Sequence, residues 1–361
     1  MRIAISGWSL TETHFRPQSL HLLDLFAIWR STGDELILIH PPDVSVDLPG
    51  YVHSLRLRTG RGLWSRLISE GWVVPRQAAE AGAEALFIPE PMSPLVSPVP
   101  VVAVLTARDL RPTSFPERIQ RAIGRAGLAG AAGLLRSDDL PPCARALPSL
   151  RTMPAFVGPG FTPGPAKIDG DHLRGLGLAS GYCLAFGGSE DELRILLAAW
   201  SWVSGSLGAD YPLVIIGGGE SSADNVHTLA VAARVEESIR WIERISFESL
   251  APLYRGANAF LHAGPTPTGQ ELRWALACGV PIASAETPVT VAVVGDAGYL
   301  VSPFDTRALG AACLTLIVES DVAEKLKRRG LMRASSYHEP STWQAWADVF
   351  RSILQTGRSR P

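Results

Sequence analysis

The stretch 258-NAFLHAGPTPTGQELRWALACGVPIAS-284 decides the fold, because it combines a strand, a turn, a helix and a second strand. Asn258–Ala263 is a short apolar run, and residues 264–269 form a turn rich in glycine and proline. Glu271–Cys278 carries apolar residues on one helical face, and Gly279 ends that helix before an apolar second strand. In a parallel α/β sheet such a turn follows the carboxyl end of a strand, where the helix N-terminus attracts anions. The stretch therefore predicts one wall of a ligand site.

Length and composition favour two domains and exclude several classes of protein. The chain has 361 residues, of which 46% are hydrophobic, and its formal net charge is −2. One core rarely serves so long a chain, and interspersed charges give no footprint for nucleic acid. No run approaches the ~18 apolar residues of a membrane span. The cysteines are widely spaced, as reduced, packed thiols are: Cys143, Cys183, Cys278 and Cys313. We expect a cytoplasmic protein without a metal or a cofactor.

Strands and helices alternate along the first half, which predicts a parallel, doubly wound sheet. The expected strands are Arg2–Ser6, Glu35–His40, Tyr51–Leu57, Ala85–Pro89, Val99–Thr106, Gly130–Ser137 and Met153–Val157. The expected helices are Gln18–Arg30, Leu63–Ala81 and Pro116–Ala126.

Gly158–Pro165 is the strongest break in the pattern, and the alternation restarts after it. We predict Rossmann-like domains over 1–165 and 166–338, and a terminal helix over 339–361 that crosses back to the first domain. The expected strands of the second domain are Tyr182–Phe186, Leu213–Ile216, Ser238–Glu243, Asn258–Ala263, Val280–Ala283 and Gly298–Ser302. The expected helices are Glu190–Val203, Ser249–Gly256, Glu271–Cys278, Thr306–Glu319, Asp321–Ala334 and Thr342–Leu354.

The second half resembles the nucleotide-sugar half of glycosyltransferase family 4, the retaining group 1 enzymes. The resemblance rests on Asn258–Ser284, Ser249–Ala257, Val294–Pro303 and Lys325–Ser335, and more weakly on Trp64–Arg76, Phe87–Glu90, Val101–Leu110 and Leu135–Asp138. It implies an α/β protein of GT-B fold, in which two parallel sheets face an interdomain cleft. It also implies a nucleotide-sugar donor, linked to UDP, GDP or ADP, and a glycan or lipid-linked acceptor.

Several residues that this family uses at the donor site are absent. The family has a glutamate that opens the turn and a second one eight residues later, and these positions align with Thr266 and Trp274. Its basic residues for the donor diphosphate align with the acidic run Ser189–Glu192, and its His-Asp pair aligns with Arg108-Asp109. One charge contact at ~4 Å is worth roughly 4 kcal/mol at an effective dielectric of about 20. The resemblance therefore implies weak binding of a nucleotide diphosphate-sugar.

The candidate site residues follow the carboxyl ends of expected strands, where open α/β sheets bind ligands. We expect nucleotide-sugar binding by Gly187, Gly188, Ser189, Arg194, Arg244, Thr266, Gly269 and Trp274, catalysis by Arg108, Asp109 and Glu271, and acceptor binding by Trp8. Structural alternatives stay open for several of them. Paired glycines commonly end a strand, a glutamate in a first helical turn complements the helix dipole, and a helix tryptophan commonly lies in the core.

Three functions remain open from the sequence. The first is a retaining hexosyltransferase of glycan or polysaccharide biosynthesis with weak or lost activity. The second is a non-catalytic pseudo-glycosyltransferase that pairs with an active paralogue or holds a glycan. An epimerase or phosphorylase ranks last, because it needs charged groups around phosphate that this sequence lacks. A local basic face fits either solvent or a peripheral membrane contact, and consists of Arg111, Arg118, Arg121 and Arg125.

Overall fold

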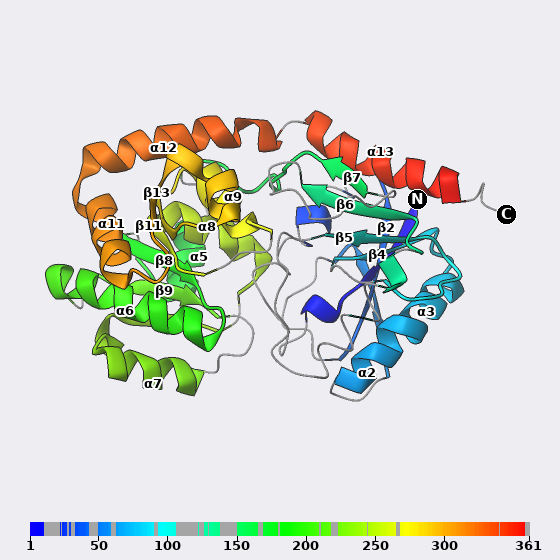
Figure 1. Ribbon diagram of the computed structural model, residues 1–361, viewed down its shortest axis with the longest axis horizontal. Coiled ribbons are helices and arrows are strands. Elements are labelled where there is room, and N and C mark those ends of the chain that lie inside the picture. The colour runs from blue at the N-terminus through cyan, green and yellow to red at the C-terminus, as the bar shows by residue number, and fades with distance from the viewer. Residues whose placement is uncertain are drawn as a thin grey trace. The chain divides into compact units, whose positions relative to one another are not determined.

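The computed structural model divides the chain into two compact units. The N-terminal unit consists of Met1–Glu12, Ser19–Phe156 and Glu339–Pro361, and the C-terminal unit of Thr13–Gln18 and Val157–His338 (Figure 1). The residues that the structure describes are 1–10, 22, 24–26, 29, 33–42, 50–58, 63–89, 93–105, 122, 126–128, 130–137, 150–164, 169–179, 181–208, 211–217, 223–243, 245–264, 268–338 and 340–357.

The described strands of the N-terminal unit form a seven-stranded parallel sheet in the order β3-β2-β1-β4-β5-β6-β7. The inner strands are mostly short apolar runs, as buried parallel strands usually are, whereas the two edge strands are largely exposed. The bounds are β1 Arg2–Ser6, β2 Glu35–His40, β3 Val52–Arg56, β4 Ala85–Ile88, β5 Val101–Val104, β6 Gly133–Ser137 and β7 Leu150–Met153.

Helices cover both faces of this sheet. On one face lies a helical run in three parts, α2 Leu63–Ile68, the π-helical η2 Ser69–Val73 and α3 Val74–Glu80. The other face packs against α13 Pro340–Gly357 (Figure 1). There the rings of Trp29, Phe87 and Phe350 meet pairwise, with centroids 5.1 to 5.5 Å apart. Helix α13 is therefore part of the N-terminal core.

The described strands of the C-terminal unit form a six-stranded parallel sheet in the order β10-β9-β8-β11-β12-β13. Their bounds are β8 Tyr182–Phe186, β9 Leu213–Ile216, β10 Ile239–Ile242, β11 Ala257–His262, β12 Ile282–Ala285 and β13 Gly298–Val301. The helices are α5 Asp169–Gly175, α6 Glu190–Leu207, α7 Ala223–Ala233, α8 Phe247–Gly256, α9 Gln270–Cys278, α10 Pro288–Val293, α11 Thr306–Val318 and α12 Ser320–Ala334.

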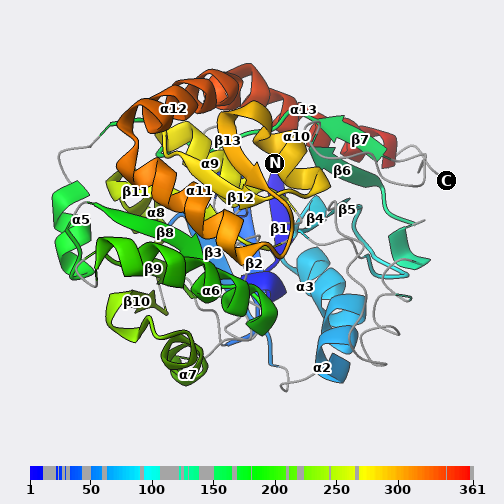
Figure 2. The ribbon, with the colours of Figure 1, turned by 60° about the vertical axis from the view of Figure 1, so that its left-hand side comes forward.

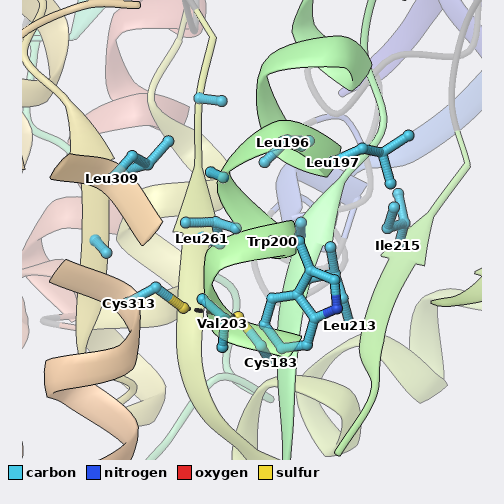
Figure 3. Packing of buried hydrophobic residues seen from close by; sticks show 14 of the residues in the cluster. Cys183, Leu196, Leu197, Trp200, Val203, Leu213, Ile215, Leu261, Leu309 and Cys313 are labelled. Atoms are coloured by element: carbon cyan, nitrogen blue, oxygen red, sulfur yellow. Dashed lines mark hydrogen bonds between the residues drawn. The ribbon is translucent and has the colours of Figure 1, made fainter. Parts of the chain in front are cut away.

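One face of the C-terminal sheet is covered by α6, α7 and α11, and the residues between them form its main core. Figure 2 shows α6 and α11 side by side, and a Cβ on Gly310 would lie only 2.5 Å from the carbonyl oxygen of Ala199. Figure 3 shows Trp200 in this core beside Cys183 and Cys313, whose sulfurs are 3.5 Å apart. Both cysteines are fully buried thiols.

The α/β class with two parallel sheets, which the sequence predicted, is confirmed. Several individual elements differ from the prediction. The expected strand Met153–Val157 is wrong, because β7 ends at Met153 and Pro154 has no N–H to extend the ladder. Helix α5 begins at Asp169, where a linker was expected, and α7 and α10 were not expected. Most of the expected helices Gln18–Arg30 and Pro116–Ala126 lies outside the described residues.

Candidate functional site

The order in which successive strands are added to the C-terminal sheet reverses between β8 and β11. These strands are neighbours, but β8 is followed by β9 on one side and β11 by β12 on the other. In open α/β sheets, ligands bind outside the carboxyl ends of the strands at such a switch point. The residues that follow β8 and β11 therefore define the candidate site.

Helix α6 begins directly after β8, and its own side chains cap its N-terminus. The Ser189 hydroxyl accepts from the Glu192 N–H at 3.4 Å, and the Ser189 N–H donates to Glu192 Oε2 at 2.9 Å. This reciprocal capping box engages N–H groups that would otherwise be open to an anion. The pattern Ser-x-x-Glu is visible in the sequence, although the location of the Glu192 carboxylate is not.

The Glu192 carboxylate lies against two glycines at the switch point. A Cβ built on Gly188, after β8, would lie 1.6 Å from Glu192 Oε2. A Cβ built on Gly264, after β11, would lie 2.6 Å from Glu192 Cδ and 2.7 Å from Oε1. The carboxylate thus fills the space that side chains at both glycines would occupy.

Trp241 gives a packing reason for a second pair of glycines. Its indole lies against Gly187, after β8, and Gly217, after β9, where built Cβ atoms would come within 3.0 and 2.6 Å of the ring. The ring therefore lies at the carboxyl ends of these strands. Sequence reasoning did not single out Trp241, because these contacts join residues that are distant in the chain.

Trp274 is a core residue of α9. Its side chain is fully buried and stacks on Phe161, with ring centroids 4.9 Å apart and planes inclined by 10°. Tyr254 packs against both rings, and its hydroxyl donates to the backbone carbonyl of Glu271 at 2.9 Å. The position that aligned with the family's second glutamate therefore holds an aromatic cluster.

A buried polar group lies where β11 and β12 end. Ser284 Oγ lies 3.1 Å from the Ala285 carbonyl oxygen, to which it donates, and 2.9 Å from His262 Nδ1. The other ring nitrogen, Nε2, lies 3.8 Å from Glu271 Oε1. Burial lowers the pKa of His262 to about 4, so the imidazole is neutral at neutral pH. Glu271 is also buried, on the first turn of α9.

Gly269 forms the N-cap of α9 in a conformation that requires glycine. Its φ is +67°, and a built Cβ would lie 2.8 Å from Val293 Cγ2. Behind it the first turn of α9 is buried, with Arg273 donating to Gln270 Oε1 at 2.9 Å. The left-handed conformation of Gly269 connects residue 268 to the first turn of α9. Residues 265–267 lie outside the described part.

The remaining expected site residues are spread over the two units. Arg194 lies on α6, where its guanidinium pairs with the exposed carboxylate of Glu190. Trp8 is buried in η1 of the N-terminal unit, directly after β1. Four expected residues lie outside the described ones, namely Arg108, Asp109, Arg244 and Thr266. A common site for these residues, and the interdomain cleft itself, stay predictions.

Two features are absent from the described part of the chain. No helix there is long and apolar enough to cross a membrane. No group of three or more histidine, cysteine, aspartate or glutamate side chains there could hold a metal ion. The basic face of Arg111, Arg118, Arg121 and Arg125 lies outside the described residues.

Part of the chain is similar to known glycosyltransferases. Residues 181–319 match the family model described as Glycosyl transferases group 1. The O-antigen chain mannosyltransferase B of Escherichia coli is 29% identical over 160 residues, which is 44% of this chain. The match spans only 42% of that relative's length.

Solved structures resemble the chain along nearly its whole length. Sucrose-phosphate synthase from Thermosynechococcus elongatus has a TM-score of 0.72 at 15% identity, covering 99% of this chain and 100% of that one. WaaG, a glycosyltransferase involved in lipopolysaccharide biosynthesis, has a TM-score of 0.71 at 12% identity, covering 96% and 99%. Anabaena HepE in complex with UDP and glucose has a TM-score of 0.69 at 13% identity, covering 98% and 100%.

These comparisons confirm the GT-B fold and the resemblance to group 1 glycosyltransferases. The chain is therefore glycosyltransferase-like over residues 181–319, and part of it is similar to an O-antigen chain mannosyltransferase.

Proposed function

We propose that this chain is a cytoplasmic, glycosyltransferase-like protein of glycan biosynthesis whose transferase activity is weak or lost. Its donor would be a nucleotide sugar linked to UDP, GDP or ADP, and its acceptor a glycan or a lipid-linked glycan. Where turnover is lost, the chain acts as a non-catalytic subunit beside an active paralogue. Anabaena HepE, one of the similar structures, was solved with UDP and glucose, which supports this class of ligand.

The observation that carries the proposal is the acidic N-terminus of α6 at the switch point. Transfer from a nucleotide sugar develops negative charge on the leaving diphosphate, and enzymes stabilise that charge with fixed donors or cations. Here the first turn of α6 instead carries Glu190, Asp191 and Glu192. The Glu192 carboxylate is held at the helix end by the Ser189 N–H. This arrangement disfavours a diphosphate at that position.

The state of α9 supports the same conclusion. Trp274 cannot accept a hydrogen bond from a sugar or a ribose, and its stacking on Phe161 keeps it in the core. Glu271 is a carboxylate on the same helix, but it is buried beside His262. A transferase that used Glu271 would first have to expose it.

Calorimetric titration of the full chain with UDP, GDP and ADP, and with their sugars, tests the proposal. We expect dissociation constants weaker than about 1 mM, equivalent to binding free energies smaller than about 4 kcal/mol. Hydrolysis and transfer of the same sugars should be far slower than about 1 s⁻¹, which is the low end of turnover numbers for enzymes. Micromolar binding together with turnover at such rates would show an active donor site and refute the proposal.

A further inference from the structure

We infer that Cys183 and Cys313 are a site of reversible oxidation, at which a small disulfide such as oxidised glutathione converts two thiols into a cross-link between β8 and α11. Both cysteines are free thiols in the structure. The inference goes beyond the proposed function, because it concerns the core of the C-terminal unit and does not depend on the state of the donor site.

The first observation is the approach of the two sulfur atoms. Cys183 Sγ and Cys313 Sγ are 3.5 Å apart, and Figure 3 shows the two side chains pointing toward each other. A disulfide bond is about 2.05 Å long, so the sulfurs need to move together by only about 1.5 Å. The two residues are 130 positions apart in the sequence, so the fold and not the local pattern brings them together.

The second observation is that packed elements hold both cysteines. Cys183 lies in β8, which pairs with β9 on one side and with β11 on the other. Cys313 lies in α11, one turn after Gly310, where a Cβ would lie only 2.5 Å from the Ala199 carbonyl oxygen of α6. This close packing fixes α11 against its neighbour, so the two sulfurs stay opposite each other in the folded chain.

The third observation is burial, which sets the conditions for the reaction. Both side chains are fully buried, and burial raises the pKa of the Cys183 thiol well above its usual range. Exchange with a disulfide needs a thiolate that reaches the oxidant, so the closed core protects the pair. Helix α11 reaches the surface, where Val318 is 59% exposed, and local opening of this helix uncovers the sulfurs. The pair therefore responds to sustained oxidation.

The chemistry balances with oxidised glutathione as the oxidant. The thiolate of one cysteine attacks a sulfur of the glutathione disulfide, so a mixed disulfide forms and one glutathione thiolate leaves. The second cysteine loses its proton and attacks the protein sulfur of the mixed disulfide, which forms the cross-link and releases the second glutathione. The protein gives up two electrons and two protons, and the oxidant becomes two glutathione thiols. Reduced glutathione reverses both steps.

The cross-link should stabilise the C-terminal unit. It closes a loop that runs from β8 to α11 and contains most of the C-terminal sheet. A disulfide restricts the unfolded chain more strongly as the loop that it closes becomes longer. Oxidation should therefore shift the unfolding equilibrium toward the folded chain.

The experiment incubates the full chain overnight with mostly oxidised or mostly reduced glutathione, with and without urea well below the unfolding midpoint. Remaining thiols are then alkylated, and disulfides are mapped by mass spectrometry of an unreduced digest. The double variant Cys143→Ala, Cys278→Ala keeps only the pair; position 143 lies outside the described residues. The variant Cys313→Ala removes the cross-link.

We expect oxidised glutathione to yield a peptide that joins residues 183 and 313, faster in mild urea, and reduced glutathione to remove it. The double variant should yield the same peptide. The cross-linked chain should have an unfolding equilibrium constant at least about tenfold smaller than the reduced chain, measured by urea denaturation. Cys313→Ala should show no such difference. Hydrogen exchange should slow in α11 and stay unchanged in α13 of the N-terminal unit.

Two results would overturn the inference. In one, Cys183 and Cys313 stay reduced even in mild urea, or each takes up only a single glutathione without forming the cross-link. In the other, the cross-linked chain is less stable than the reduced chain, which would mean that the 3.5 Å contact is packing that a disulfide distorts. Both results are read from the thiols and from stability, so they are independent of nucleotide-sugar binding.

Discussion

Trp274 and Phe161 stack face to face, with ring centroids 4.9 Å apart and planes inclined by 10°. Phe161 belongs to the glycine- and proline-rich segment before the second sheet, and Trp274 belongs to α9. The contact therefore fixes that segment against the helix that borders the candidate site. Both side chains are almost completely buried.

This stacking predicts that a carboxylate at position 274 costs stability rather than restoring a donor site. Trp274→Glu leaves a cavity, which for a buried tryptophan typically costs about 3–5 kcal/mol, and it buries a charge besides. We expect at least that loss in the free energy of unfolding, measured by urea denaturation, and no gain in nucleotide-sugar affinity. The control Trp202→Phe alters a half-exposed tryptophan of the same unit and should cost less than about 1 kcal/mol. A stable Trp274→Glu variant with improved donor binding would contradict the stacked core.

A buried ion pair ties α8 to α5 and predicts a second stability effect. Arg255 donates through Nε and Nη2 to both oxygens of Asp169, at 2.6 and 2.7 Å, and through Nη1 to the Gly160 carbonyl at 2.9 Å. Asp169→Asn leaves the guanidinium buried without its counter-charge, which should cost about 3–5 kcal/mol. The exposed pair Arg174–Asp171 serves as the control, because Asp171→Asn should cost less than about 1 kcal/mol.

Urea denaturation of a double variant checks that prediction. Arg255→Met combined with Asp169→Leu should be less destabilising than Asp169→Asn alone, because no unpaired charge remains. Equal losses for Asp169→Asn and Asp171→Asn would mean that the buried pair contributes no more than a surface pair.

Phe350 predicts which unit depends on the terminal helix α13. Its ring contacts Trp29 and Phe87 in the N-terminal core, and Phe350→Ala should cost about 3–5 kcal/mol. Hydrogen exchange should accelerate in β2 and β4 and stay unchanged in β8 and β11. The control Gln344→Ala, on the exposed face of α13, should leave exchange unaltered. Faster exchange in β8 would contradict the placement of α13 in the N-terminal core.

The hydrophobic pattern of the sequence predicted the strands that are buried along most of their length. Strands β1, β2, β8 and β9 have the predicted bounds, because each is a short apolar run between breakers. Helix α5 was missed because its sequence is mostly polar and follows a proline-rich break. Its buried Asp169 pairs with Arg255 of α8, a contact that the local pattern does not reveal.

The candidate site was less predictable because its geometry depends on contacts between distant residues. The sequence offered two interpretations of Trp274, as a pocket residue or as core, and only the stacking on Phe161 chooses between them. Glu192 was predicted to repel a diphosphate, but its contact with Gly264 joins residues 72 positions apart and leaves no local signal. The roles of Arg108 and Thr266 in the site stay predictions.

The buried imidazole of His262 predicts a loss of stability in mild acid. The pKa of histidine is about 6.5 in an unfolded chain, and burial lowers that of His262 to about 4 in the folded protein. Between these values the unfolded chain binds a proton that the folded chain does not. The contribution of His262 is therefore complete above pH 6.5 and is lost as the pH falls toward 4.

The size and origin of this effect can be measured directly. The pKa difference corresponds to about 3 kcal/mol in the free energy of unfolding. We expect urea denaturation between pH 7 and pH 4 to reveal that loss as the difference between the unmodified chain and His262→Gln, whose amide can still donate to Ser284. Glu271 lies 3.8 Å from Nε2, and its carboxylate favours the imidazolium, so Glu271→Gln should lower the pKa of His262 further. An imidazole resonance that titrates near pH 6.5 would mean that the His262 ring is open to water, and with it the end of β11 where the carboxylate of Glu192 lies against Gly264.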